Sequence, residues 1–237
     1  MSHKATSKLP AFVIFDLDNT LYDYQECDRE GTSNLLAFLA REIQEDESTI
    51  SKGLSTARIA VKARLGSTAA SHSRIAYINE FVNEAHKPMP ITRVALAERV
   101  YWESFFAKLN LRPGAKELIL KLKELKIPTF LITDLTLSIQ IEKLEKLGLN
   151  DAFDIVISSE EAGGDKVTGL PFQLLESYIG QSSDEYWCLG DQCWDFPTNF
   201  GPVHSDFALD EINCQHNHSV TDFNSIQELL QLACRNN

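Results

Sequence analysis

The chain has 237 residues, of which 34 are acidic and 22 basic, so its formal net charge at pH 7 is −12. No cluster of lysine and arginine marks a surface for a phosphate backbone, and we therefore expect no nucleic acid partner. No apolar run approaches the roughly 20 residues that span a membrane, and we expect no membrane partner either.

The length suits one large domain, or a main domain with a smaller companion. The first residues lack the apolar core of a signal peptide. Five cysteines, an odd number without the CxxC spacing of a metal site, favour reduced thiols. These features predict a cytoplasmic protein, and they leave its oligomeric state unknown.

An apolar run at residues 11–15 has the length and composition of a strand buried on both faces, as in a parallel sheet covered by helices. It ends in two carboxylates, Asp16 and Asp18. Ligands of such sheets bind beyond the carboxyl ends of the strands. Two acids so close together repel each other unless a cation or a shared proton lies between them. By themselves they fit a metal site, an acid/base pair, or a solvated turn or helix cap.

Residues 29–108 carry helical periodicity and little strand signal. The breaks in this pattern lie near Gly53, Gly66 and residues 87–90. They divide the segment into several helices. The sequence therefore predicts an all-helical insert after the first strand.

From residue 112 onward, strand patterns alternate with helix patterns. The predicted strands are residues 127–132, 153–157, 186–189 and, more weakly, 207–209. The predicted helices are residues 115–125, a segment ending at 147, 172–178 and 225–234. Strands separated by helices of this length indicate right-handed βαβ units and a parallel sheet.

Polar residues follow several of these strands, where a parallel sheet brings them to one edge. They are Thr133, Lys166, Asp191 and Asp195. Each also has an ordinary structural explanation, as a helix cap, a surface lysine or a turn. Together with the two acids of the first strand they suit phosphoryl transfer, in which a carboxylate attacks phosphorus and Mg²⁺ neutralises charge.

The chain resembles the haloacid dehalogenase superfamily of phosphohydrolases, since four motif segments appear in the family's order. Residues 15–21 match the first motif, 131–134 the second, 159–166 the third, and Gly190-Asp191 with Asp195 the fourth. The resemblance implies an α/β fold with a Rossmann-like parallel sheet core, and an inserted all-helical cap domain. The expected core is residues 1–22 and 109–237, and the expected cap is residues 23–108.

The resemblance also implies roles. Asp16 is expected to be the nucleophile and a metal ligand. Asp18 is expected to be the general acid and base, with its backbone carbonyl on the metal. Thr133 and the backbone N–H of Asp134 are expected to bind phosphate, and Lys166 to steady both nucleophile and phosphate.

The fourth motif is expected to supply Asp191 as an Mg²⁺ ligand and Asp195 as an outer ligand. In the third motif, Val167 and Gly169 stand where the family usually has proline.

The expected activity is therefore that of a Mg²⁺-dependent phosphatase, which hydrolyses a small phosphorylated metabolite through an aspartyl-phosphate. Asp18 argues against metal-free dehalogenation. A phosphomutase of the same superfamily, or an inactive domain that kept the fold for binding, are the alternatives. Possible substrate-specificity residues are Tyr22 and Tyr24 after the nucleophile, and His72 and Arg74 at an expected helix start, where ordinary packing and capping are the competing explanation.

Overall fold

The structure is a computed structural model that describes residues 8–85, 89–180, 185–197, 204–208, 218–219 and 222–236. The chain divides into two compact units. One unit is Tyr24–Leu109, and the other combines the segments before and after it. The unit that combines the flanking segments carries every strand of the described chain.

The sheet confirms the predicted parallel architecture. Its strands are β1 (Val13–Phe15), β2 (Thr129–Thr133), β3 (Ile155–Ser158), β4 (Tyr186–Gly190), β5 (His204–Ala208) and β6 (His218–Ser219). Their order is β3-β2-β1-β4-β5-β6, and every pairing is parallel. The central position of β1 places its carboxyl end between those of β2 and β4. The two-residue β6 was not predicted.

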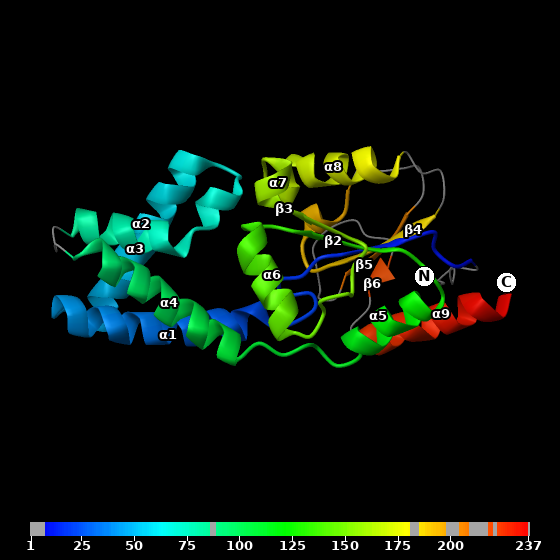
Figure 1. Cartoon of the computed structure of the whole chain (residues 1–237), viewed down its shortest axis with the longest axis horizontal. Helices are drawn as coiled ribbons and strands as arrows, with labels where there is room; N and C mark the ends of the chain where they lie inside the picture. The colour runs from blue at the N-terminus through cyan, green and yellow to red at the C-terminus, as the bar shows by residue number, and fades with distance from the viewer. Residues whose placement is uncertain are drawn as a thin grey trace. The chain divides into compact units, whose positions relative to one another are not determined.

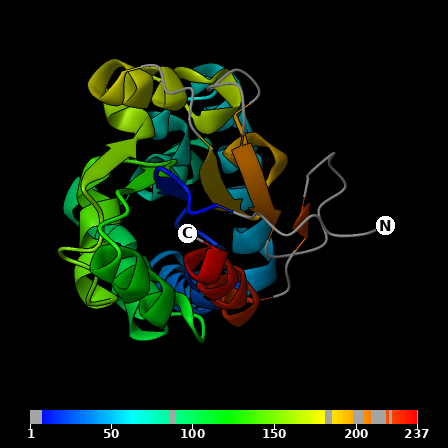
Figure 2. The same cartoon turned by 90° about the vertical axis from the view of Figure 1, so that its right-hand side faces the viewer.

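Helices cover both faces of the sheet, which explains why the strands are almost wholly apolar. The helices of this unit are α5 (Ala115–Glu124), α6 (Leu137–Lys146), α7 (Ser159–Ala162), α8 (Leu170–Ile179) and α9 (Phe223–Asn236). The pair α7 and α8 lies on one face, and the pair α5 and α9 on the other (Figures 1 and 2).

Side chains alternate between these faces along each strand. Ile14, Phe130 and Cys188 belong to the cluster that Phe172 and Leu175 of α8 complete. Val13, Phe15 and their neighbours at alternate positions point to the opposite face, and all of them are buried.

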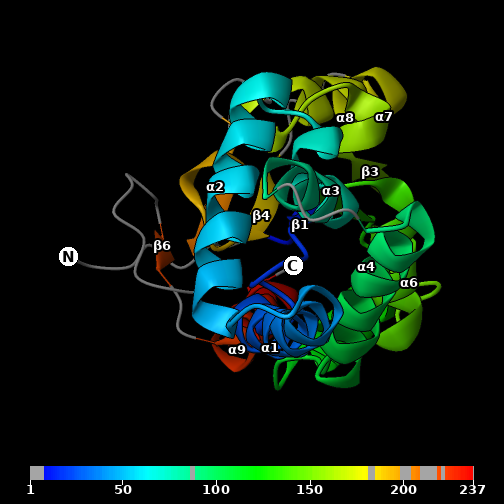
Figure 3. The same cartoon turned by 90° about the vertical axis from the view of Figure 1, so that its left-hand side faces the viewer.

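The unit Tyr24–Leu109 is all-helical, as predicted. Its helices are α1 (Tyr24–Ile43), α2 (Glu47–Leu65), the short 3₁₀ helix η1 (Ala69–His72), α3 (Arg74–Glu84) and α4 (Ile91–Ala107). The contacts of α1 with α2 and α4, and of α3 with α2 and α4, close these four long helices into a bundle (Figure 3). Gly53 permits one close approach, because a Cβ there would lie 2.4 Å from the Phe81 ring.

The structure also tests the expectations of reduced thiols and of no membrane-spanning segment. Cys27, Cys188 and Cys234 are reduced, but Cys193 is disulfide-bonded, so the expectation of reduced thiols is wrong at this position. Among the described residues, no helix combines the length and the apolar character that crossing a bilayer requires. The cytoplasmic location stays a prediction.

Candidate active site

Three aspartates meet at the carboxyl ends of β1 and β4. Asp16 directly follows β1, and Asp191 and Asp195 follow β4. Carboxylate oxygens of these three residues lie within 4.8 Å of one another, and all three residues are buried. The sheet has therefore brought together acids from the first and fourth expected motifs.

Lys166 enters this cluster from the loop after β3. Its Nζ lies 2.5 Å from Asp16 Oδ1 and 2.5 Å from Asp195 Oδ1. The loop is held by Asp134, whose Oδ1 accepts hydrogen bonds from the Lys166 backbone N–H at 2.8 Å and from the Ser159 hydroxyl at 2.9 Å. The Asp134 side chain thus supports the loop that carries Lys166.

The absence of proline at position 169 has a conformational reason. Lys166–Thr168 form a single 3₁₀ turn that ends at Gly169 with φ of 77°. Proline is restricted to φ near −65° and cannot adopt that conformation, whereas glycine adopts it freely. The departure at Gly169 therefore belongs to a well-formed loop that still delivers Lys166 to Asp16.

The charges of the cluster are not balanced. Burial raises the pKa of Asp16 well above its usual range; Lys166 opposes this shift, and the carboxylates of Asp195 and Asp191 reinforce it. Burial works against the charged form of Lys166, but Asp16 and Asp195 outweigh it and hold the lysine pKa well above its usual range. Three acids around one ammonium leave an excess of negative charge.

This donor set fits a hard divalent cation. Oxygen ligands from a few carboxylates are what Mg²⁺ takes in proteins. Asp16 Oδ2 is buried and has no hydrogen-bond partner among the described residues, which a buried carboxylate oxygen rarely tolerates. A cation held by Asp16 and Asp191 would provide that oxygen with a ligand bond and would neutralise the surplus negative charge.

The groups around Asp191 and Asp195 fix their orientations. Asp191 Oδ2 accepts hydrogen bonds from the side-chain amides of Asn19 at 2.9 Å and Gln192 at 2.7 Å. Asp195 Oδ2 accepts from the backbone N–H groups of Asp191 at 3.0 Å and Gln192 at 2.8 Å. A Cβ at Gly190 would lie 2.4 Å from the Asp195 Cβ, so only glycine permits this packing.

Thr133 lies at the end of β2 with its hydroxyl oriented by α6. Gln140 donates from Nε2 to Thr133 Oγ1 and to the Asp134 carbonyl, both at 2.5 Å. The carbonyl is an acceptor only, which fixes the amide orientation. Because Thr133 Oγ1 accepts from Gln140, its own proton is directed elsewhere, and the Asp134 carbonyl is a distant acceptor at 3.4 Å. The next residue, Leu135, has φ of 90°, a strained value of the kind that collects at functional sites.

Asp18 does not join the aspartate cluster with its side chain. Lys143 of α6 places Nζ 2.7 and 2.8 Å from the two Asp18 oxygens, and the Tyr22 hydroxyl donates to Oδ1 at 2.6 Å. Burial favours the neutral form of Asp18, but Lys143 and the hydrogen bond from Tyr22 outweigh it and lower the pKa of that carboxyl. The expected contact of its backbone carbonyl with a metal stays a prediction.

The other expected specificity residues lie in the unit Tyr24–Leu109. Arg74 begins α3, as predicted, with Ser73 as its N-cap. Its guanidinium donates to the Tyr24 hydroxyl, to Asp28 Oδ1 at 3.3 Å and to the Tyr101 hydroxyl at 3.1 Å. It also donates to the His72 carbonyl at 3.0 Å. Arg74 and Tyr24 therefore have a structural task inside this unit, and whether they select substrate stays a prediction.

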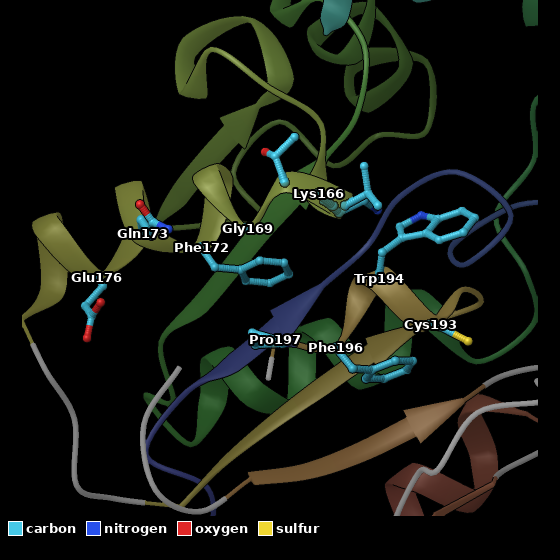
Figure 4. A pocket seen from close by; sticks show the side chains of 11 residues that line it. Lys166, Gly169, Phe172, Gln173, Glu176, Cys193, Trp194, Phe196 and Pro197 are labelled. Atoms are coloured by element: carbon cyan, nitrogen blue, oxygen red, sulfur yellow. The ribbon is translucent and has the colours of Figure 1, made fainter. Parts of the chain in front are cut away.

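A cavity of about 300 Å³ lies beside the Lys166 loop (Figure 4). Its lining includes three aromatic side chains, Phe172, Trp194 and Phe196, beside polar ones such as Gln173 and Glu176 (Figure 4). Asp16 and Asp191 are not among its lining residues. The cavity is therefore adjacent to the aspartate cluster without containing it.

The comparisons with known proteins identify the family. A family model described as haloacid dehalogenase-like hydrolase matches residues 11–198. The chain belongs to this family. The hydrolase is also 36% identical over 183 residues to a ribulose-1,5-bisphosphate 5-phosphatase from Halopiger xanaduensis, which covers 76% of this chain and 75% of the relative.

Solved structures show the same fold. The HAD-hydrolase YfnB from Bacillus subtilis, bound to magnesium, is 17% identical with a TM-score of 0.66, over 94% of this hydrolase and 100% of that chain. CbbY from Rhodobacter sphaeroides, in complex with phosphate, is 16% identical with a TM-score of 0.59, over 94% and 100% of the two chains. At these identities the likeness supports the fold alone.

Gln140 and Lys143 were not predicted as site residues of the hydrolase. Both lie on α6, three residues apart, and both are fully buried. Residues three and four apart share a helix face, and Leu144 and Leu147 mark the buried face here. An amide and an ammonium on an otherwise apolar face are the signal that points to them.

Proposed function

We propose that this hydrolase is a Mg²⁺-dependent phosphatase that cleaves a small phosphorylated metabolite through an aspartyl-phosphate on Asp16. The observation that carries the proposal is the buried cluster in which Asp16 meets Lys166, Asp191 and Asp195. Asp16 there has one oxygen paired with an ammonium and one without a hydrogen-bond partner among the described residues.

In the first step, a carboxylate oxygen of Asp16 attacks phosphorus and the bond from phosphorus to the leaving oxygen breaks. Asp18 enters this step with a proton taken up from solvent or kept from the previous turnover, and it gives that proton to the leaving oxygen, which departs as an alcohol. In the second step, Asp18 takes a proton from a water molecule that attacks phosphorus, and the Asp16 carboxylate is released with inorganic phosphate. Attack at phosphorus leaves both original oxygens on Asp16.

The groups around Asp16 suit the demands of phosphoryl transfer, which needs positioning and neutralisation of charge. The Lys166 ammonium stabilises negative charge on the transferring group, and the Thr133 hydroxyl, with its proton directed away from Gln140, donates to a phosphate oxygen. Asp16 and Asp191 would hold Mg²⁺, and Asp195 would be an outer ligand. When bound, the ion neutralises the phosphate charge that would otherwise repel the carboxylates.

We further propose a phosphorylated sugar as the substrate class. The relative from Halopiger xanaduensis, 36% identical, is named a phosphatase of ribulose-1,5-bisphosphate. That name supports a sugar phosphate as the first choice for this hydrolase.

The test is phosphate release over a panel of sugar phosphates, sugar bisphosphates, nucleoside monophosphates and phosphorylated acids, with and without Mg²⁺. We expect release of free phosphate from at least one sugar phosphate, only in the presence of the ion. An isomeric phosphate without free phosphate would indicate a mutase, and no turnover of any member would indicate a binding domain. Either result contradicts the proposal.

A further inference from the structure

Lys143 is a lysine buried where helix periodicity calls for an apolar residue. Its side chain is fully buried, and its Nζ lies 2.7 and 2.8 Å from the two oxygens of Asp18, 125 residues away in sequence. Burying an ammonium is unfavourable unless an opposite charge compensates it. The ion pair with Asp18 provides that compensation.

Two side chains hold Asp18, which is still partly exposed. Lys143 contacts both of its oxygens, and the fully buried Tyr22 donates to Oδ1 at 2.6 Å. The Asp18 side chain nevertheless remains 28% exposed. A carboxyl group that two partners hold and that is still partly exposed has a defined position and is accessible to a bound molecule.

The two acids of the first motif form ion pairs with different lysines. Lys166 pairs with Asp16 and Asp195, whereas Lys143 pairs with Asp18. The loop after β3 carries Lys166, and α6 carries Lys143. This division matches a division of tasks between attack and proton transfer.

We propose that Lys143 is a positioning residue for proton transfer: it holds the Asp18 carboxyl group where it reaches the leaving oxygen. The proposal rests on the role of Asp18 in the proposed function. A proton donor must lie within hydrogen-bond reach of the atom it protonates. Lys143 acts through Asp18 and is not itself the donor.

The test compares two leaving groups. An alkyl oxygen leaves poorly without a proton, whereas 4-nitrophenolate leaves readily as an anion. We would measure kcat/KM for the best sugar phosphate of the panel and for 4-nitrophenyl phosphate, because kcat/KM includes the step in which the leaving group departs. The variant is Lys143→Met, and the matched control is Lys146→Met, an exposed lysine on the same helix.

We expect Lys143→Met to lower kcat/KM for the sugar phosphate by about 100-fold, within the range of general acid catalysis. The loss for 4-nitrophenyl phosphate should stay below about fivefold. The inhibition constant of inorganic phosphate should be unchanged, and Lys146→Met should match the wild type throughout. Equal losses on both substrates, or a weakened inhibition by phosphate, would assign Lys143 to general structure or to substrate binding and overturn the proposal.

Lys143→Met leaves Asp18 without its cation and could therefore fail to fold. A second variant keeps the proposal testable in that case. Asp18→Asn with Lys143→Met removes both charges together. Its kcat/KM for the sugar phosphate should equal that of Asp18→Asn alone, and a further loss of more than about threefold would contradict the proposal. Failure of the proposed function is distinguishable, because the wild type would then release no phosphate from either substrate.

Discussion

Lys166 Nζ lies 2.5 Å from Asp16 Oδ1, and both side chains are at least nine-tenths buried although 150 residues separate them. The pair joins the end of the central strand to the loop after β3. It gives the proposed nucleophile a cation on one oxygen, while the other oxygen is buried without a hydrogen-bond partner among the described residues.

Removing this ammonium leaves Asp16, Asp191 and Asp195 without their lysine. We expect Lys166→Met to lower kcat by about 100-fold to 1,000-fold, the usual effect of deleting one preorganised charge at a reacting group. Steady-state phosphate release measures this loss. The control is Lys123→Met on the exposed face of α5. A Lys166→Met enzyme with wild-type kcat would show that the lysine has no part in the reaction.

Gly190 leaves room for the Asp195 side chain. A Cβ there would lie 2.4 Å from the Asp195 Cβ and 2.6 Å from Oδ2. We expect Gly190→Ala to displace Asp195, to break its hydrogen bonds with the backbone of Asp191 and Gln192, and to lower activity at least tenfold. A crystal structure of the variant would show the displacement. An unmoved Asp195 with full activity would contradict this account of the glycine.

The Asn19 amide orients Asp191, and Asn19 itself has φ of 65°. Asn19→Gly removes the amide and keeps a residue that tolerates this φ. We expect the Mg²⁺ concentration for half-maximal activity to rise by about 10-fold to 100-fold, as for other groups that orient metal ligands. Titration of activity with Mg²⁺ measures it. An unchanged Mg²⁺ requirement would mean that Asp191 is not a ligand or that Asn19 does not orient it.

Arg74 is expected to stabilise the unit Tyr24–Leu109. Its guanidinium bonds Asp28, Tyr24 and Tyr101, and lies 5.0 Å above the Tyr101 ring. We expect Arg74→Met to lower the free energy of unfolding by about 1.5–3 kcal/mol, the contribution of hydrogen bonds to a charged group. Urea unfolding followed by tryptophan fluorescence measures this.

The matched control for Arg74→Met is Arg58→Met, because Arg58 is an exposed arginine on α2. If Arg74→Met leaves stability unchanged but alters which substrates are cleaved, Arg74 is a specificity residue and not a structural one.

Much of the fold follows from local pattern. The strand run before Asp16 is apolar throughout and that before Thr133 is apolar except for Thr129, because helices cover both faces of the sheet; this feature is visible in the sequence. Since parallel strands present their carboxyl ends at one edge, the approach of Asp16 to Asp191 also follows from the order of elements.

The contacts that hold the side chains of Asp18 and Thr133 do not follow from local sequence pattern. Lys143 and Gln140 share the face of α6 that Leu144 and Leu147 mark as buried, but the sequence does not show which side chains they contact there. Those partners depend on how α6 packs in the fold, a tertiary contact that the local sequence does not encode. Likewise, only the φ of Gly169 in the folded loop explains why glycine stands there in place of proline.

The central claim is that Asp16 attacks phosphorus. The most direct measurement is phosphate release by Asp16→Asn, in saturating Mg²⁺, with the best sugar phosphate of the panel and beside the wild type with and without chelator. We predict no detectable release by the variant, and loss of wild-type activity when the chelator removes the ion. Release by Asp16→Asn at the wild-type rate would contradict the account.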